Sequence, residues 1–327
     1  MTAAADTDLD PRAVLAAGLS DRRGRPVRVE AVTAAPLATR STHPIERLAV
    51  TLDTGERLPV VFKRLVWGPD NKHPWREPLV YRRLLAGGRF GAPELYASVY
   101  DEARQRYWLF LEDVGDWSLS DGPPGAWRAA VRWLAEMHGT YLGREAELRA
   151  LGCLREQDSR YFTALATAAR RVLQRADDPA VLARFDRLMA DYPALVADLA
   201  RQPRTFVHGD IFVHNLMVQA PPPRVRPIDW ESAGVGPVAW DLARLLEGWG
   251  TDTPAFLAAY CAECARYAAG PWDDRSFRRA FRLCDVLLVL LDIRLSGGPC
   301  LSAAAVESWL GQLELAWRGA TGEGGDV

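Results

Sequence analysis

Hydrophobic and polar residues alternate along the first part of the chain with a period of two. The alternation is clearest in three runs, PVRVEAV (26–32), ERLAVTL (46–52) and LPVVFKRL (58–65). Strands that bury one face show this pattern. A turn-forming segment at residues 53–55 separates the last two runs. The pattern predicts three antiparallel strands.

The next segment changes to a helical period. PWREPLVYRRLLAGG (74–88) places Leu79, Leu84 and Leu85 on one face and ends in two glycines. Residues 91–115 then predict two more strands around a charged turn. We therefore expect a small antiparallel sheet of five strands with one helix.

The rest of the chain is dominated by helical periodicity. A helix is expected at 127–142, amphipathic helices follow through residue 200, and the region 238–319 is helical again. The apolar run VLLVLLDI (286–293) is interrupted by acidic residues and is typical of a buried helix. Because no stretch of eighteen or more apolar residues occurs, no membrane span is expected.

These patterns predict an α+β protein of about two domains, as its 327 residues suggest. We expect a flexible tail and lead-in at 1–25, a sheet-based part at 26–115 and a helical part at 116–327. Glycine and proline cluster at 112–125, where we place the junction. The acidic N-terminus lacks the basic and apolar regions of a signal peptide, so a cytoplasmic location is expected.

Composition and charge narrow the functional classes. Hydrophobic residues make up 49% and charged residues 25%, with a net charge of −2, so neither nucleic acid nor an anionic membrane is an expected partner. The odd count of five cysteines argues against a disulfide framework. Cys261 and Cys264 lie in a helical pattern without a second pair, so buried thiols are favoured over a zinc site.

Two short motifs carry the candidate chemistry. HGDIFVHN (208–215) and PIDWE (227–231) contain Asp210, Asn215 and Asp229. The strand-turn-strand pattern between Asn215 and Asp229 predicts a hairpin that brings both residues together over one metal. Such a set suits phosphoryl transfer from ATP, in which one carboxylate orients a hydroxyl while an amide and a second carboxylate hold Mg²⁺. Singly, each could be an ordinary turn residue.

The histidines and a later aspartate have less specific interpretations. His208 is expected to brace the loop through hydrogen bonds, and His214 to be structural or substrate-facing because Mg²⁺ avoids imidazole. His138 is expected to pack at a helix end. Asp241, in AWDLARLL, either supports the loop or caps a helix.

The spacing Asp-x4-Asn resembles the catalytic loop of protein kinases, with HGD in place of HRD. HGD, a hydrophobic strand and then IDWE resemble the aminoglycoside phosphotransferase and choline-kinase-like family of small-molecule kinases. The resemblance implies a two-lobed protein-kinase-like fold. Residues 26–115 would form the nucleotide-binding N-lobe with its hinge. Residues 116–327 would form a helical C-lobe with the catalytic loop, the metal site and the acceptor pocket.

The same resemblance assigns nucleotide contacts in the N-lobe. Lys63, one of only two lysines in the chain, would reach the α- and β-phosphates of ATP, although an edge lysine that points to water is the alternative. Glu77 would pair with Lys63, with Pro78 placing it at the start of its helix. Glu46 and Glu94 are weaker candidates for that partner.

The hinge and the phosphate turn are less constrained. FLEDVG (110–115) resembles the hinge, where the backbone of Glu112 and Val114 would contact the adenine. The chain has no G-x-G-x-x-G motif. The candidate phosphate turn is APLATRSTHP (35–44), in which Ser41 and Thr42 offer donors.

The expected activity is an ATP- and Mg²⁺-dependent transfer of phosphate to a hydroxyl of a small polar metabolite, with an antibiotic among the candidates. Asp210 would accept the hydroxyl proton or orient the hydroxyl. A housekeeping sugar, amino-alcohol or nucleoside kinase is the first alternative, and an inactive nucleotide-binding scaffold the second. GTP in place of ATP, the acceptor and the oligomeric state stay open.

Overall fold

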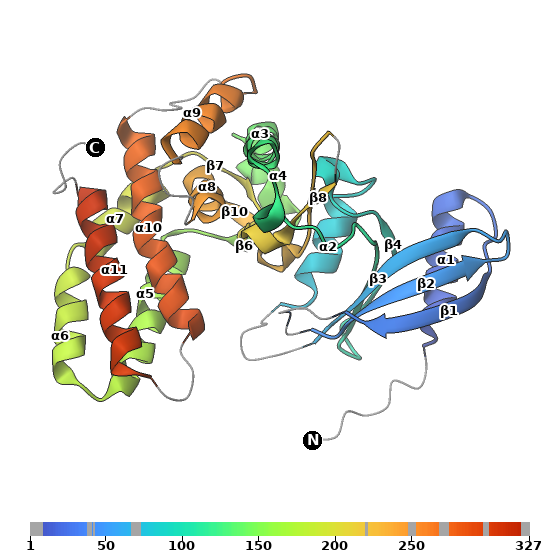
Figure 1. Ribbon diagram of the computed structural model, residues 1–327, viewed down its shortest axis with the longest axis horizontal. Coiled ribbons are helices and arrows are strands. Elements are labelled where there is room, and N and C mark those ends of the chain that lie inside the picture. Colours follow the sequence, from blue (N-terminus) through green and yellow to red (C-terminus); the bar gives the residue numbers. More distant parts are fainter. Residues whose placement is uncertain are drawn as a thin grey trace. The chain divides into compact units, whose positions relative to one another are not determined.

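An antiparallel sheet of five strands forms the first part of the molecule (Figure 1). In chain order the strands are β1 (Val29–Pro36), β2 (Ile45–Leu52), β3 (Arg57–Leu65), β4 (Leu95–Asp101) and β5 (Arg106–Glu112). Their order in the sheet is β1-β2-β3-β5-β4. The five strands predicted from the alternating pattern are confirmed.

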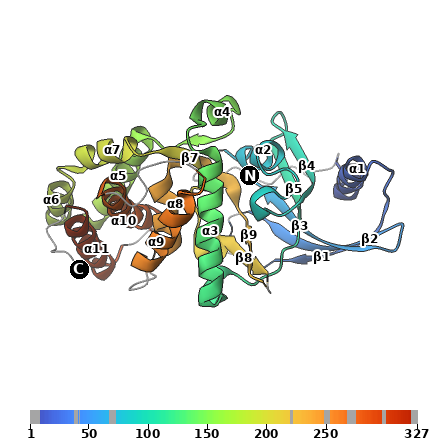
Figure 2. The ribbon, with the colours of Figure 1, turned by 90° about the horizontal axis from the view of Figure 1, so that it is seen from above.

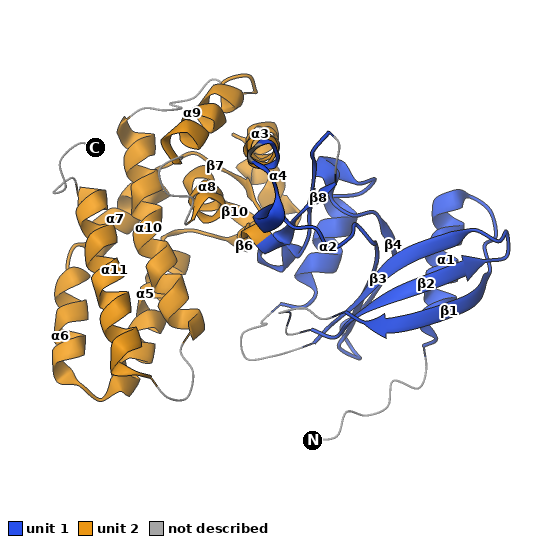
Figure 3. Ribbon diagram, viewed as in Figure 1, with its two compact units in different colours: residues 1–126, 214–232 blue, residues 127–213, 233–327 orange. Residues whose placement is uncertain are grey.

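This is a computed structural model. It describes residues 9–37, 41, 43–66, 73–219, 222–247, 253–267, 275–296 and 301–321. The chain divides into two compact units: residues 1–126 with 214–232, and residues 127–213 with 233–327 (Figure 3). The hairpin that follows the HGD loop thus groups with the sheet, whereas the pattern had suggested the helical part for it.

The sheet buries aromatic residues on one face. Phe62 of β3 stacks on Phe110 of β5 with ring centroids 4.3 Å apart, and Trp108 meets Phe62 edge-on at 5.5 Å. Since successive side chains of a strand point to opposite faces, Lys63 must lie on the face opposite Phe62. The helix α2 (Arg76–Arg83) is shorter than the predicted 74–88.

A helix at the N-terminal end of the chain corrects one expectation. Residues 1–25 were expected to be a flexible lead-in, but Pro11–Arg23 form the helix α1. Asp10 caps it by accepting a hydrogen bond from the Arg12 N–H, and Gly24 ends it in the left-handed region at φ 63°. Leu15 and Leu19 of α1 join the same apolar cluster as Phe62.

The first unit also contains the predicted hairpin. Its strands β8 (Leu216–Gln219) and β9 (Arg224–Pro227) pair antiparallel, with Leu216 opposite Pro227. A bridge between Ser118 and Met217 connects β8 to the segment after the hinge. The hairpin is therefore confirmed, and its open end places the two predicted metal ligands next to each other along the backbone.

The second unit is mainly helical. Most of α3 (Pro124–Tyr141) belongs to it, together with α4 (Glu145–Ala150), α5 (Ser159–Leu173), α6 (Pro179–Leu188), α7 (Tyr192–Ala200), α8 (Val238–Leu246), α9 (Thr253–Cys264), α10 (Arg275–Ser296) and α11 (Ala303–Thr321). A small sheet has the order β6-β10-β7, formed by Arg155–Glu156, Gly234–Pro237 and Arg204–Val207. Figure 2 shows α10 and α11 side by side.

The helix α10 is buried along most of its length, which confirms the interpretation of VLLVLLDI. None of the helices in the described ranges is long and apolar enough to cross a membrane. The cysteines within those ranges, Cys153, Cys261, Cys264 and Cys284, are buried. Burial was predicted for Cys261 and Cys264. Burial raises the pKa of the Cys264 thiol to about 12, so this thiol stays protonated and unreactive.

The contact of α1 with β4 makes a testable prediction about Gly18. A Cβ added there would lie 2.4 Å from the Tyr96 carbonyl oxygen and 2.5 Å from the Ala97 Cβ. Glycine to alanine normally stabilises a helix, but here we expect overpacking. Gly18→Ala should lower the free energy of unfolding by about 1–3 kcal/mol, measured by urea denaturation.

Gly311, inside α11, is the matched control. No described atom lies within 4 Å of a Cβ at this position, so Gly311→Ala should raise the free energy of unfolding by roughly 0.5–1 kcal/mol. If both variants gained stability, the close packing of α1 on the sheet would be contradicted.

Candidate active site

Lys63 is the centre of a buried charge cluster in the first unit. Its side chain is 6% exposed, and its Nζ donates to Glu77 Oε2 at 2.7 Å and to Asp229 Oδ1 at 2.5 Å. The strand β3, the helix α2 and the end of the hairpin each supply one of these residues. Lys63 is therefore no edge lysine in water, and the pairing with Glu77 that the family resemblance implied is present.

The cluster keeps the ammonium charged. Burial alone would lower the pKa of Lys63, but Asp229, Glu77 and Glu231 outweigh that effect and hold the pKa above its ordinary value. Burial raises the pKa of the Glu77 carboxyl, while the Lys63 charge lowers it. A buried charge of either sign is costly unless it is paired, so the two buried members, Lys63 and Glu77, require each other.

Glu77 connects the ammonium to the IDWE motif. It is the second residue of α2, as Pro78 had suggested, and it is 1% exposed. Its Oε1 accepts a hydrogen bond from the Trp230 N–H at 3.1 Å. One carboxylate thus fixes both the Lys63 side chain and the backbone that follows Asp229.

The hairpin brings Asn215 and Asp229 together, as predicted. The Ile228 N–H donates to the Asn215 carbonyl at 2.9 Å. Asp229 directly follows Ile228 and therefore lies beside this hydrogen-bonded pair. Asp229 has φ 67°, in the left-handed region that non-glycine residues seldom adopt. Residues in such sparsely populated conformations cluster at functional sites.

The donor set fits Mg²⁺ better than a transition metal. Asn215 and Asp229 offer hard oxygens, the ligand type that Mg²⁺ prefers. Within the described ranges no group of three or more His, Cys, Asp or Glu could hold a metal by itself. Mg²⁺ commonly takes one or two protein carboxylates and completes its shell with water and phosphate, and this pair suits that habit.

The strand β5 is bound to the hairpin through Arg226, a residue that no sequence pattern had singled out. Arg226 of β9 is 3% exposed; it pairs with the Glu112 carboxylate and donates to the Gly91 carbonyl at 2.7 Å. The Glu112 N–H donates to the Glu94 carbonyl at 2.8 Å, so this N–H already has an acceptor within the sheet. The Val114 N–H has no acceptor among the residues described.

The candidate phosphate turn is described only in part. Ser41 Oγ accepts a hydrogen bond from the His43 N–H at 3.1 Å, and Thr42 lies outside the described residues. His43, a second residue that was missed, is buried: its Nε2 lies 2.9 Å from Glu231 Oε2, and its Nδ1 accepts from the Val66 N–H. The end of the turn is therefore bound to the IDWE motif.

In the second unit, Asp241 holds the HGD loop. Its Oδ2 accepts from the His208 N–H at 2.6 Å and its Oδ1 from the Gly209 N–H at 2.9 Å. Since Pro237 occupies the N-cap position of α8, Asp241 supports the loop and is not the helix cap. His138 is more than a packing residue, because its ring bonds both Asp241 and the Tyr260 hydroxyl, the latter at 2.6 Å.

Asp210 follows this braced backbone. Its side chain is 41% exposed, and its N–H donates to the His208 Nδ1 at 3.4 Å, so His208 braces the loop as expected. The Nε and Nη2 of Arg244 each lie 3.4 Å from Asp210 Oδ1. Arg244 was not singled out from the sequence, although it follows Asp241 by one helical turn.

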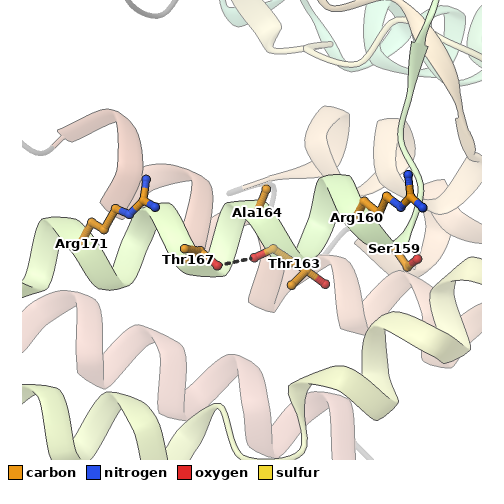
Figure 4. A pocket seen from close by; sticks show the side chains of 6 residues that line it. All are labelled: Ser159, Arg160, Thr163, Ala164, Thr167 and Arg171. Atoms are coloured by element: carbon orange, nitrogen blue, oxygen red, sulfur yellow. Dashed lines mark hydrogen bonds between the residues drawn. The ribbon is translucent and has the colours of Figure 1, made fainter.

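One pocket is lined by none of these residues. It runs along α5 and is lined by Ser159, Arg160, Thr163, Ala164, Thr167 and Arg171 (Figure 4). All six are exposed side chains of a single helix, and none was predicted to act in the site.

Comparison with solved structures supports the fold. Aminoglycoside 2'-phosphotransferase-IIIa, solved as its GDP complex, is similar over 94% of this chain and 99% of that one, with a TM-score of 0.58 and 14% identity. Macrolide 2'-phosphotransferase type I matches over 96% and 99%, with a TM-score of 0.55 and 19% identity. Plasmodium vivax ethanolamine kinase Pv091845 matches over 88% and 82%, with a TM-score of 0.56 and 12% identity.

At identities this low, structural similarity establishes the fold alone. It confirms the expected protein-kinase-like α+β fold. No curated protein matches the chain. The model of the phosphotransferase enzyme family, however, matches residues 49–280. That span contains the Lys63 cluster, the HGD loop and Asp241. Because the family model matches most of the chain and residues of both units, the chain belongs to the phosphotransferase enzyme family.

Proposed function

We propose that this protein transfers the γ-phosphoryl group of ATP to a hydroxyl of a small polar molecule. The observation that carries the proposal is the buried ammonium of Lys63 held between Glu77 and Asp229. A charged donor fixed by one fully buried acid, with a second acid beside it, suits the binding of a phosphate chain with its metal.

The residues of the first unit would hold the nucleotide. Lys63 would donate to the α- and β-phosphates while Glu77 keeps the ammonium in place. Asn215 and Asp229 would hold Mg²⁺, which when bound neutralises charge on the phosphates. Ser41 and Thr42 would contact the phosphate chain from the turn.

Backbone groups at the hinge would read the base. The Glu112 carbonyl and the Val114 N–H form an acceptor and a donor two residues apart, which suits the edge of adenine. The Arg226 side chain would hold this strand against the hairpin, since it bonds both Glu112 and Gly91. ATP is the proposed donor, and GTP is compared with it in the test below.

Asp210 would act on the acceptor. The acceptor oxygen forms a bond to the γ-phosphorus while the bond from that phosphorus to the β,γ-bridging oxygen breaks. Asp210 receives or orients the hydroxyl proton, which passes on to solvent. The products are ADP and a phosphate monoester. The bracing of His208 and Gly209 by Asp241 supports this role, because a proton acceptor must be held within hydrogen-bond reach.

An antibiotic hydroxyl is the first candidate acceptor. The similar structures include aminoglycoside and macrolide phosphotransferases as well as an ethanolamine kinase, so enzymes named for antibiotic acceptors and one named for an amino alcohol share this fold. From Asp241 onward the sequence has a mild excess of acids over arginines, which is compatible with a cationic amino sugar. A housekeeping sugar, amino-alcohol or nucleoside kinase is the alternative outcome.

The first test combines an acceptor screen with Asp210→Asn. Purified protein is incubated with Mg-ATP or Mg-GTP and a panel of antibiotics, sugars, amino alcohols and nucleosides, and ADP or GDP release and product mass are measured. Asp210→Asn should lower turnover by roughly 10²–10⁴-fold, the scale for losing a positioned base. Calorimetry should show unchanged Mg-ATP affinity.

Asp186→Asn is the control, since Asp186 is an exposed acid of the same unit that pairs with Arg170; this variant should keep full turnover. Normal turnover in Asp210→Asn would remove Asp210 from the role of base. Efficient phosphorylation of a common sugar or nucleoside, with no antibiotic modified, would favour the housekeeping reading.

The second test labels lysines with an acyl-phosphate analogue of ATP. Because Lys63 and Lys72 are the only lysines, peptide mapping gives an unambiguous result. We expect labelling at Lys63 that excess Mg-ATP suppresses, while any labelling of Lys72, which lies outside the described residues, is unaffected. An inert Lys63 together with ATP-protected Lys72 would show that the nucleotide site is placed wrongly.

A further inference from the structure

The segment that follows Asp210 in the HGD loop contains neither arginine nor lysine. The residues between Asp210 and Asn215 are Ile211, Phe212, Val213 and His214. A guanidinium beside Asp210 comes from Arg244, on the helix α8 of the same unit. A residue from a separate element thus supplies a positive charge beside the proposed base.

Three contacts fix the Arg244 side chain, which is 14% exposed. Its Nε and Nη2 face Asp210 Oδ1, and its Nη1 pairs with the Glu247 carboxylate. The guanidinium carbon lies 4.8 Å from the ring centroid of Phe212, a distance at which a cation–π interaction is attractive. The guanidinium is thereby held before any substrate binds.

The contact between Arg244 and Asp210 is suited to orienting the carboxylate and is too long for a strong ion pair. Both Arg244 nitrogens approach the same oxygen, Oδ1, and both distances are 3.4 Å, long for a charged hydrogen bond. Asp210 is also well exposed, so the pair should add little to stability. The rotation of the Asp210 carboxylate about its side-chain bond, by contrast, depends on the position of the Arg244 guanidinium.

The helix α8 places both supports of the loop. Asp241 accepts from the backbone of His208 and Gly209, and Arg244 follows it by three residues on the same side of the helix. The backbone and the side chain of the HGD segment are therefore oriented by consecutive turns of one element.

We propose that Arg244 is a positioning residue for Asp210: it sets the orientation of the Asp210 carboxylate toward the acceptor hydroxyl, and Glu247 and Phe212 hold it in place. This inference rests on the proposed function. A misplaced catalytic group can lose about 10²-fold in rate, so the effect should appear in kcat and not in nucleotide binding.

The test is a double-mutant cycle in kcat, measured by ADP release with Mg-ATP and the acceptor that the panel identifies, or with water as acceptor. Arg244→Ala should lower kcat about 10- to 100-fold and leave the KM for ATP and the Tm nearly unchanged. In the Asp210→Asn background the same substitution should cost less than about twofold, because residues that act through one another are not additive.

Chemical rescue separates positioning from folding. Added guanidinium ion should restore part of the turnover of Arg244→Ala, whereas an alkylammonium ion at equal ionic strength should not. Arg244→Lys keeps the charge but loses the planar fork, so it should recover only part of the loss. Should Arg244→Ala not fold, Arg244→Gln carries the same comparisons.

Arg170→Ala is the matched control. Arg170 forms an exposed ion pair with Asp186 in the same unit, with Nε 2.7 Å from Oδ1, and its loss should leave kcat unchanged. Equal losses from Arg244→Ala with and without Asp210 would overturn the inference, as would wild-type kcat in Arg244→Ala. A fully active Asp210→Asn would instead overturn the proposed function itself, so the two failures are distinguishable.

Discussion

The ammonium of Lys63 is the constraint on which the first unit depends. An amine buried in the fold must be paired, and here one partner comes from α2 and the other from the end of the β8–β9 hairpin. Successive side chains of β3 point to opposite faces, so with Phe62 in the apolar cluster Lys63 must lie on the other face. Sheet, helix and hairpin are thus located by one charge, and the same charge is the group best suited to a phosphate chain.

Much of this arrangement could be predicted because its signals are local. Alternation gave the five strands, and the strand-turn-strand pattern gave the hairpin that unites Asn215 with Asp229. The pairing of Lys63 with Glu77 came from family resemblance, since residues on a strand and the following helix have no spacing rule of their own. The helix α1 was missed because only two of its residues, Leu15 and Leu19, are fully buried, too few to form a recognisable apolar stripe in an alanine-rich segment.

Side-chain pairs between distant parts of the chain could not be predicted from the sequence. Arg226 and Glu112 are 114 positions apart, and His43 and Glu231 are 188 apart, so no periodicity connects them. The boundary between the units shows a related limit. Clustered glycine and proline at 112–125 mark one passage of the chain between units, but another falls between Val213 and His214, inside the segment HGDIFVHN. The sequence of HGDIFVHN does not indicate that its residues belong to two different units.

The two units solve the same electrostatic problem with opposite signs. In the first, acids from α2 and the hairpin hold a cation, Lys63; in the second, a cation from α8 faces an acid, Asp210. Each of these two charges is paired with residues of its own unit, so its orientation is set by the folding of that unit. Under the proposed function, this orientation exists before the nucleotide or the acceptor binds. Preorganised charge of this kind costs no reorganisation when the reaction occurs. Helices α2 and α8 are short, yet each carries an acid that accepts backbone N–H groups of a sequence motif. Glu77 of α2 accepts from Trp230. Asp241 of α8 accepts from His208 and Gly209. Anchoring the backbone and orienting the side chain from one helix makes both depend on the packing of that helix. Under the proposed roles, substitutions on α2 should affect nucleotide binding, whereas substitutions on α8 should affect turnover.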